Sequence, residues 1–167
     1  MLVVADTSPL NYLISIDSVE TLQQLYRTVL IPHEVRDELL VADAPAVVRS
    51  WASNLPEWIE VCAADPALRD DPRWQFLDLG ERAALALAVA RQPSILLIDE
   101  RKGTEVARSQ GLPVTGTLGI LDEAARRHLI SLPEVVERLK QTSFRYPKTI
   151  VERLLAEDAK RRSGRQK

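Results

Sequence analysis

Two short apolar runs, each ending in an aspartate, restrict the fold of this chain more than any other feature. The first run is LVVAD at residues 2–6, and the second is SILLID at residues 94–99. Both are continuously apolar rather than alternating, as expected for parallel strands that are covered on both faces. Three shorter segments, 28–32, 58–62 and 112–116, are also predicted to be strands. The sequence therefore predicts a mostly parallel sheet.

Helical segments separate the predicted strands. Residues 79–92 are rich in strong helix formers and apolar on almost every side, which predicts a central, buried helix. Gly111 is expected to end the helix predicted within 99–111. Strands that alternate with helices indicate an α/β fold, here a three-layer α/β/α sandwich with a mostly parallel central sheet. Further helices are predicted from Pro9, from Pro32, and over 117–129, 132–142 and 147–162.

Length and composition favour one globular domain. The chain has 167 residues, of which 46% are hydrophobic and 28% charged, a balance that supports a packed core. We expect a single domain over residues 1–158 and a basic, flexible tail over 159–167. The Pro- and Asp-rich stretch 63–77 is expected to be a long surface connection.

Several classes of protein are disfavoured by the sequence. No apolar stretch approaches the roughly 20 residues of a membrane span, and the N-terminus lacks the pattern of a signal peptide. Cys62 is the only cysteine, so it forms no internal disulfide and supports no zinc cluster. These features fit a cytoplasmic protein. The net charge of −2 does not by itself indicate a polyanionic ligand.

Asp6 and Asp99 occupy equivalent places at the ends of two predicted strands. The carboxyl ends of parallel strands face one crevice, above all where the strand order switches direction, so the two acids are expected to lie close together. The alternative is that each aspartate caps the helix that follows it. Thr7 and Ser8 already offer hydroxyl caps after Asp6, which weakens that alternative.

Two glutamates on predicted helices have both a structural and a functional interpretation. Glu38 lies in PHEVRDELL, where an acid on an amphipathic helix is usually just solvated. Glu81 lies on the apolar stripe of the helix 79–92, but it also stands three residues after Asp78, the spacing of a capping box. Gly80, between them, would allow another group to approach closely. Both interpretations stay open at this point.

Converging carboxylates require compensation, because like charges raise one another's pKa. A hard divalent cation supplies it, and oxygen ligands without a His/Cys cluster favour Mg²⁺ or Mn²⁺ over zinc. Such an ion can orient water and stabilise the in-line transition state of phosphodiester hydrolysis.

Four segments together resemble the motifs of PIN-domain proteins. They are VVADTSPLNYL, IPHEVRDELL, LDLGERAALALA and LLIDERKGTEVARSQGLPVTGTLGIL, and they span most of the chain. Within the superfamily the sequence is similar to the toxin-like branch related to VapC ribonucleases. The resemblance places the motif acids on Asp6, Glu38, Glu81 and Asp99.

The resemblance implies a metal-dependent endoribonuclease in which these four acids hold Mg²⁺ or Mn²⁺. It also implies an RNA substrate, a small antitoxin partner and a homodimer. Two residues depart from the branch: Glu100 stands where a second Asp is common, and Arg82 follows Glu81 where a small or acidic residue is usual. Supporting roles are expected for Ser8, Glu100, Thr115 and Thr117.

Three rival functions are weighed against this one. A phosphatase with an Asp nucleophile usually has a second acid two residues on, where this chain has Ser8. A Rossmann dinucleotide site requires a glycine-rich turn after the first strand, which is absent from the sequence. A non-catalytic RNA- or protein-binding module on the same fold is the main alternative, although all four acids are present. The candidate cations for RNA contact are Arg82, Arg101, Lys102 and Arg108, although such residues more often lie on solvated helix faces.

Overall fold

The computed structural model describes residues 2–164 and has a parallel sheet where the sequence predicts one. Its five strands are all parallel and lie in the order β3-β2-β1-β4-β5. The central strand β1 pairs with β2 on one side, with Val3 opposite Val29, and with β4 on the other, with Val4 opposite Leu96. The strands are β1 (Leu2–Ala5), β2 (Thr28–Pro32), β3 (Ile59–Cys62), β4 (Ile95–Leu97) and β5 (Val114–Thr115).

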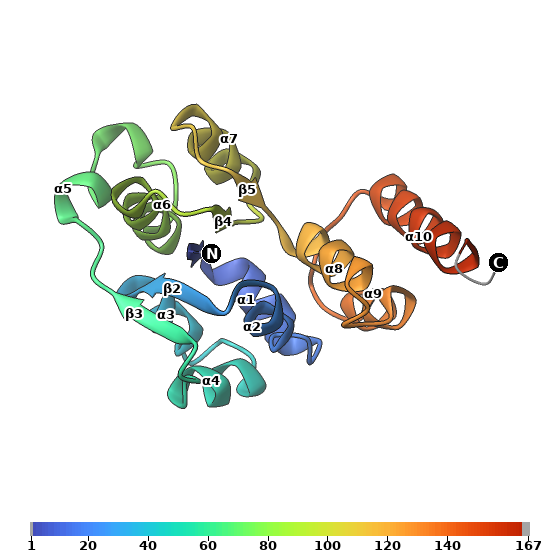
Figure 1. The fold of residues 1–167 in the computed structure, drawn as a ribbon. Coiled ribbons are helices and arrows are strands. Elements are labelled where there is room, and N and C mark those ends of the chain that lie inside the picture. The colour runs from blue at the N-terminus through green and yellow to red at the C-terminus, as the bar shows by residue number, and fades with distance from the viewer. Residues whose placement is uncertain (1, 165–167) are drawn as a thin grey trace. The chain divides into compact units, whose positions relative to one another are not determined.

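Helices cover both faces of this sheet (Figure 1). Helix α6 (Leu79–Arg91) contacts β1, β2 and β4 and carries α7 (Arg101–Ser109) beside it. The other layer comprises α1 (Thr7–Ser15), α2 (Thr21–Tyr26), α3 (His33–Leu39) and α4 (Ala46–Ser53). This is the predicted three-layer α/β/α sandwich, and right-handed crossovers between parallel strands account for the two layers.

Burial follows the sequence pattern closely. Val3, Val4 and Ala5 of β1 are fully buried, as continuous apolar strands require. Every residue of α6 from Gly80 to Ala88 except Arg82 is buried, which confirms that this helix is central. Gly111 follows α7 with φ +75, the left-handed conformation that a C-terminal glycine permits.

The stretch 63–77 has more structure than the predicted surface connection. It contains a short helix, α5 (Pro66–Arg69), and a 3₁₀ turn, η1 (Pro72–Trp74), each capped by the aspartate before its proline. The Trp74 and Leu77 side chains are only 4% and 5% exposed, so they anchor the end of this stretch. The Asp-Pro pairs that indicate a loop therefore start two short helical turns.

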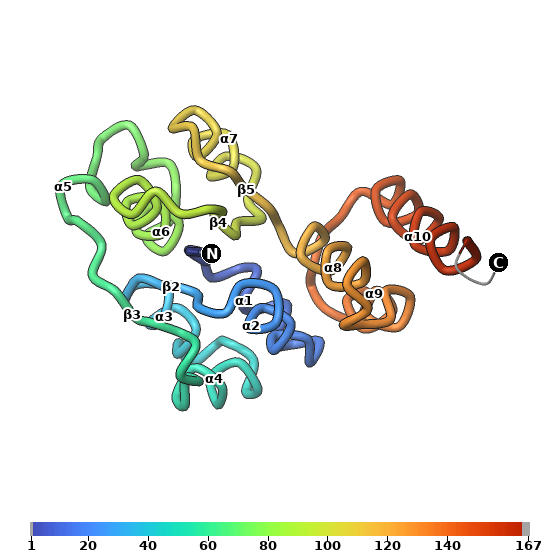
Figure 2. Tube along the Cα trace, in the orientation of Figure 1, coloured from blue at the N-terminus to red at the C-terminus, as the bar shows by residue number. Residues whose placement is uncertain are grey.

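Contacts divide the chain into two compact units, 1–117 and 118–167, which Figure 2 traces by residue number. The second unit is helical where it is described, with α9 (Leu132–Lys140) and α10 (Lys148–Ser163) following α8 (Thr117–Arg126). This division does not decide whether residues 1–158 form a single domain, which stays a prediction. No helix of residues 2–164 combines the length and the apolarity needed to cross a membrane.

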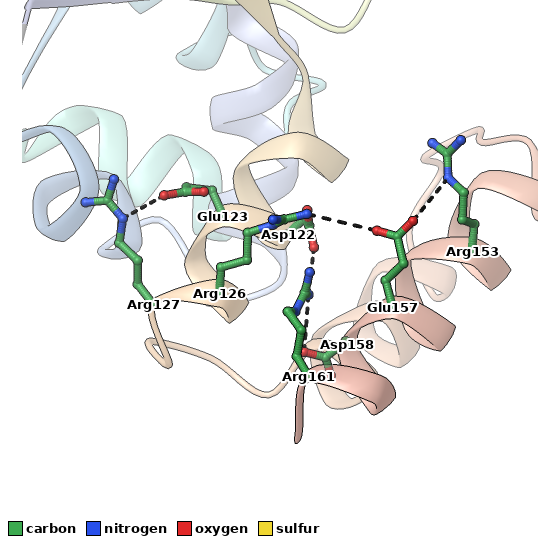
Figure 3. Close-up of polar contacts among 8 residues, drawn as sticks. All are labelled: Asp122, Glu123, Arg126, Arg127, Arg153, Glu157, Asp158 and Arg161. Carbon is green, nitrogen blue, oxygen red and sulfur yellow. Dashed lines mark hydrogen bonds and ion pairs between the residues drawn. The ribbon is translucent and has the colours of Figure 1, made fainter. Parts of the chain in front are cut away.

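Ion pairs join α8 to α10 within the second unit (Figure 3). Asp122 accepts hydrogen bonds from Arg126 at 2.9 Å and from Arg161 at 2.8 Å. Burial opposes its ionisation, but these two guanidinium groups hold the pKa of Asp122 below its usual value. Arg162 pairs with the buried Asp158 at 2.7 Å. Of these residues, Arg161 and Arg162 belong to the predicted tail. Residues 159–163 of that tail continue α10, and 165–167 lie outside the described residues.

Candidate metal site at the carboxyl edge of the sheet

Asp6 and Asp99 lie at the point where the strand order switches direction. The chain passes from β1 to β2 on one side, whereas β4 pairs with β1 on the other. Asp6 directly follows β1, and Asp99 comes two residues after β4. The Asp6 N–H donates to the Leu97 carbonyl at 2.9 Å, which ties the end of one strand to the other. The backbone therefore places the two aspartates after neighbouring strands, and their convergence on one crevice stays a prediction.

The Asp6 carboxylate is buried without full compensation. Its residue is 1% exposed, and Oδ1 has no hydrogen-bond partner among the described residues. Burial raises the pKa of Asp6 well above its usual value; the Thr7 N–H opposes the rise, and the charges of Glu81, Asp78 and Glu38 add to it. An acid in this position destabilises the fold unless a cation or a proton accompanies it.

The expectation that Thr7 and Ser8 cap the first helix is wrong. Helix α1 begins at Thr7, the N-cap residue is Asp6, and the Asp6 side chain makes no capping hydrogen bond. Thr7 Oγ1 instead donates to Glu38 Oε2 at 2.5 Å. Ser8 is half-buried in the first turn of α1. The hydroxyl of Thr7 therefore serves the acid cluster rather than the end of its own helix.

Glu38 connects three helices rather than facing solvent. Besides the Thr7 bond, its Oε1 accepts the Gly80 N–H at 2.8 Å, so the carboxylate joins α3 to α1 and α6. A Cβ at position 80 would lie 2.6 Å from Glu38 Cδ, so a larger residue there would require the Glu38 carboxylate to shift from its present hydrogen bonds. Burial raises the pKa of Glu38; Thr7 and Gly80 oppose the rise, and Asp78 and Glu34 add to it. The interpretation of Glu38 as a merely solvated acid is wrong.

Glu81 caps its helix and also lies near other candidate acids. It forms the capping box with Asp78: Glu81 N–H donates to Asp78 Oδ1 at 2.8 Å, and Asp78 N–H donates to Glu81 Oε2 at 3.1 Å. It is also buried beside the other acids. Burial, followed by the charge of Asp78, raises the pKa of Glu81 to about 7, with Glu100 and Glu38 contributing in the same direction.

Asp99 stands beside this cluster rather than within it. Its two oxygens accept the Thr117 N–H and the Thr117 hydroxyl, each at 2.7 Å. Burial raises the pKa of Asp99 against these two hydrogen bonds, and no carboxylate of the described residues is among the causes. A Cβ at position 116 would lie 2.6 Å from Asp99 Oδ1, so Gly116 makes room for it as Gly80 does for Glu38.

The remaining predicted residues have varied surroundings. Glu100 is the N-cap of α7, and its Oε2 accepts the N–H groups of Lys102 at 2.5 Å and Gly103 at 3.0 Å. Thr115 lies in β5, where its carbonyl accepts the Ile98 N–H at 2.9 Å. Thr117, as described above, holds Asp99. Of the supporting residues, Thr117 thus has the most direct role at a candidate acid.

Sequence reasoning missed two participants, Asp78 and Thr7. The sequence indicates Asp78 only as half of a capping box, although its charge adds to the effect of burial in raising the pKa of Asp6, Glu38 and Glu81. The Asp-Leu-Gly-Glu spacing could have indicated this role. A capping box places the carboxylates of Asp78 and Glu81 close together, so Asp78 adds its charge to any acid cluster that contains Glu81. Arg82 does not neutralise them: it lies 3.9 Å from Asp70, and its Nε donates to the Asp78 carbonyl at 3.4 Å.

The donor set fits a hard divalent cation in its chemistry. All four candidate acids provide oxygen ligands, and Asp6 Oδ1 is buried without a hydrogen-bond partner. Within residues 2–164, no three His, Cys, Asp or Glu side chains are grouped closely enough to hold one ion as they stand. The oxygens of Glu38 and Asp99 are occupied by the hydrogen bonds described above. The structure therefore brings Asp6, Glu38 and Glu81 into one electrostatic cluster and leaves Asp99 at its edge.

We expect the metal-free chain to lose stability as pH rises, with Glu81 as one cause. Its pKa moves from 4.5 to about 7 on folding, so in this range the folded chain holds a proton that the unfolded chain has released. The free energy of unfolding therefore falls between pH 4.5 and 7, by on the order of 3 kcal/mol, and stays low above pH 7. Urea unfolding in EDTA across this range measures the change.

Glu81→Gln should flatten this profile, because the amide keeps an oxygen acceptor for the Asp78 N–H but carries no charge. Glu134 provides a matched control, since it occupies the same third position of a helix, α9, but is exposed. Glu134→Gln should leave the profile unchanged. A Glu81→Gln variant with the full pH dependence would show that the buried cluster does not titrate through this residue.

Comparison with known families identifies the family to which this fold belongs. The model of the PIN domain family matches residues 2–160, nearly the whole chain. No curated protein matches the sequence significantly. PIN domains are generally nucleases and typically use divalent metal ions. The parallel five-stranded sheet, the acids at its switch point and the family match agree, and the chain belongs to the PIN domain family.

Proposed function

We propose that this protein is a divalent-metal-dependent endoribonuclease in which Asp6, Glu38, Glu81 and Asp99 hold Mg²⁺ or Mn²⁺. The observation that carries the proposal is Asp6: a fully buried carboxylate at the switch point, with one oxygen unpartnered and three further acids raising its pKa. A buried and incompletely paired carboxylate lowers the stability of the fold, and binding of a cation would compensate for that loss.

The chain's own contacts prepare the other acids for the same role. The Thr7 hydroxyl and the Gly80 N–H orient Glu38, and Thr117 orients Asp99 through two hydrogen bonds. These donors limit the rotation of each carboxylate before anything binds. A bound divalent ion supplies activation of water and charge stabilisation in the phosphodiester transition state.

Water is the nucleophile that this arrangement supports. Ser8, which stands where a phosphatase of the aspartyl type would have its second acid, is half-buried in α1 and provides no carboxylate. A phosphatase is therefore not supported. The proposed toxin role, with a small antitoxin partner, a homodimer and a cytoplasmic location, rests on the family resemblance alone.

RNA cleavage by the purified protein tests the proposal. In Mn²⁺ or Mg²⁺ we expect endonucleolytic cuts in an unstructured RNA, and none in EDTA, because the acids require the ion. An Asp6→Asn/Asp99→Asn double variant, purified identically, should cut at no more than about 1% of the normal rate. Single-stranded DNA of the same sequence tests whether cleavage requires the ribose 2′-hydroxyl.

Two results would count against a nuclease. Equal cutting by the double variant would indicate a contaminating ribonuclease. No cutting by either protein over a range of RNAs would favour the non-catalytic binding module, which keeps the fold and the acids without the reaction.

A further inference from the structure

Phe76 is an exposed aromatic side chain held in place by its buried neighbours. Its residue is 57% exposed, the highest value among the exposed large hydrophobic residues of the described chain. Trp74 and Leu77, on either side of it, are 4% and 5% exposed. The backbone at Phe76 is therefore anchored between buried side chains, while most of its own side chain is exposed to solvent.

Lys102 lies over this ring. Its Nζ is 6.0 Å from the ring centroid, within the range of a cation–π interaction. Arg101, its neighbour in α7, is engaged by Glu105 at 2.9 Å, and Arg82 in α6 contacts Asp70 and the Asp78 carbonyl. Lys102 has no ion pair with any residue between 2 and 164. Of these three cations it alone has its charge available for a ligand.

Both residues adjoin the acid cluster through short connections. Phe76 precedes Asp78 by two residues, and the Asp78 N–H bonds Glu81 Oε2 at 3.1 Å. Lys102 precedes Gly103, where a Cβ would lie 4.0 Å from Glu81 Cδ. Phe76 thus lies three residues before α6, and Lys102 lies in the first turn of α7, next to the glycine that faces Glu81.

We propose that Phe76 and Lys102 form a nucleotide platform, in which the ring stacks on one unpaired base of RNA and the ammonium group binds its phosphate. This inference rests on the proposed function and names residues that position its substrate. The carboxylates repel a polyanion, so a cation beside them is required to bring a phosphate close. Stacking on a phenyl ring requires an exposed base face, which a single strand offers and a duplex does not.

Binding of RNA in EDTA tests the platform without cleavage. A fluorescent single-stranded RNA of about 12 nucleotides and a hairpin of the same composition would be titrated with the full-length protein at low salt. Phe76→Ala should weaken single-strand binding at least about fivefold, and Phe76→Tyr, which keeps a ring, should stay within about twofold of the unchanged protein. Hairpin binding should hardly change.

Two matched controls separate the platform from general surface effects. Val47 is 52% exposed on α4, so Val47→Ala removes exposed apolar surface elsewhere and should not affect binding. Lys102→Ala and Arg108→Ala remove one positive charge from the first and last turns of α7. Only Lys102→Ala should weaken single-strand binding severalfold. It should also reduce the slope of the logarithm of the binding constant against the logarithm of the salt concentration by about 0.7.

The proposal is overturned if Phe76→Ala binds the single strand like the unchanged protein, if Phe76→Tyr fails as Ala does, or if the two charge variants lose affinity equally. Absence of measurable RNA binding by the unchanged protein also overturns it, as does capture of a protein partner that only Phe76→Ala loses. Its failure is distinct from that of the nuclease proposal. Cleavage that persists unchanged in Phe76→Ala removes the platform alone, whereas platform-dependent binding without metal-dependent cleavage removes the nuclease alone.

Discussion

Replacing Asp6 by Asn is expected to abolish RNA cleavage and at the same time to stabilise the metal-free fold. The rate should fall by roughly 100-fold or more, beyond the loss caused by an outer-shell partner of a metal. In EDTA the free energy of unfolding should rise by about 1–3 kcal/mol, because a fully buried, incompletely paired charge is removed. Urea unfolding and cleavage assays on the same preparations measure both effects.

Added Mn²⁺ should reverse the order of stability. The ion stabilises only the protein that binds it. The free energy of unfolding of the unchanged protein should therefore rise above that of Asp6→Asn, which should not respond to the ion. Asp65, the exposed N-cap of α5, is the matched control, because Asp65→Asn keeps a good cap and should change neither property. If Asp6→Asn is instead less stable in EDTA, Asp6 supports the start of α1 and is not a carboxylate retained for a cation.

Gly80→Ala is expected to destabilise the protein and reduce cleavage, the reverse of the usual effect of alanine in a helix. Gly→Ala normally stabilises a helix interior by about 0.5–1 kcal/mol. Here the new methyl group would lie 2.6 Å from Glu38 Cδ, so the carboxylate or the start of α6 must move. We expect a loss of about 1–3 kcal/mol in urea unfolding, as for other overpacked sites.

A double-mutant cycle isolates this contact. In a Glu38→Ala background the obstacle is gone, and Gly80→Ala should then be neutral or stabilising. Gly164→Ala serves as the control, since its nearest contact would be the Lys160 carbonyl at an ordinary 3.4 Å and its φ is −69. Equal losses from Gly80→Ala with and without Glu38 would show that the glycine is required by the backbone and not by the acid.

The strands were predictable because their signal is local and strong. Continuous apolar runs with an aspartate at the end identify β1 and β4 directly, and their parallel pairing follows from the helices between them. The buried helix α6 is equally clear, since helix formers and apolar residues cover all its sides. Burial on both faces leaves few alternatives for such segments.

The detailed site was less predictable because it depends on competition for hydrogen bonds. Spacing places Asp99 at the crevice, but it does not reveal that Thr117 occupies both of its oxygens. Nor does the sequence show that the Thr7 hydroxyl bonds Glu38, a partner 31 residues away, rather than the N-terminus of its own helix. Capping statistics describe local choices, and a distant carboxylate overrides them here.

Because of the capping box of α6, the presence of Glu81 and the presence of Asp6 are not equally informative about activity. Glu81 is required for the helix through Asp78, whether or not any reaction takes place. Asp6 makes no capping bond and is costly to bury. If the proposed reaction were lost in a descendant, substitutions should therefore accumulate first at Asp6, while Glu81 would persist under selection for folding. A surviving glutamate in this helix would say little about activity, and a surviving aspartate after the first strand would say much more.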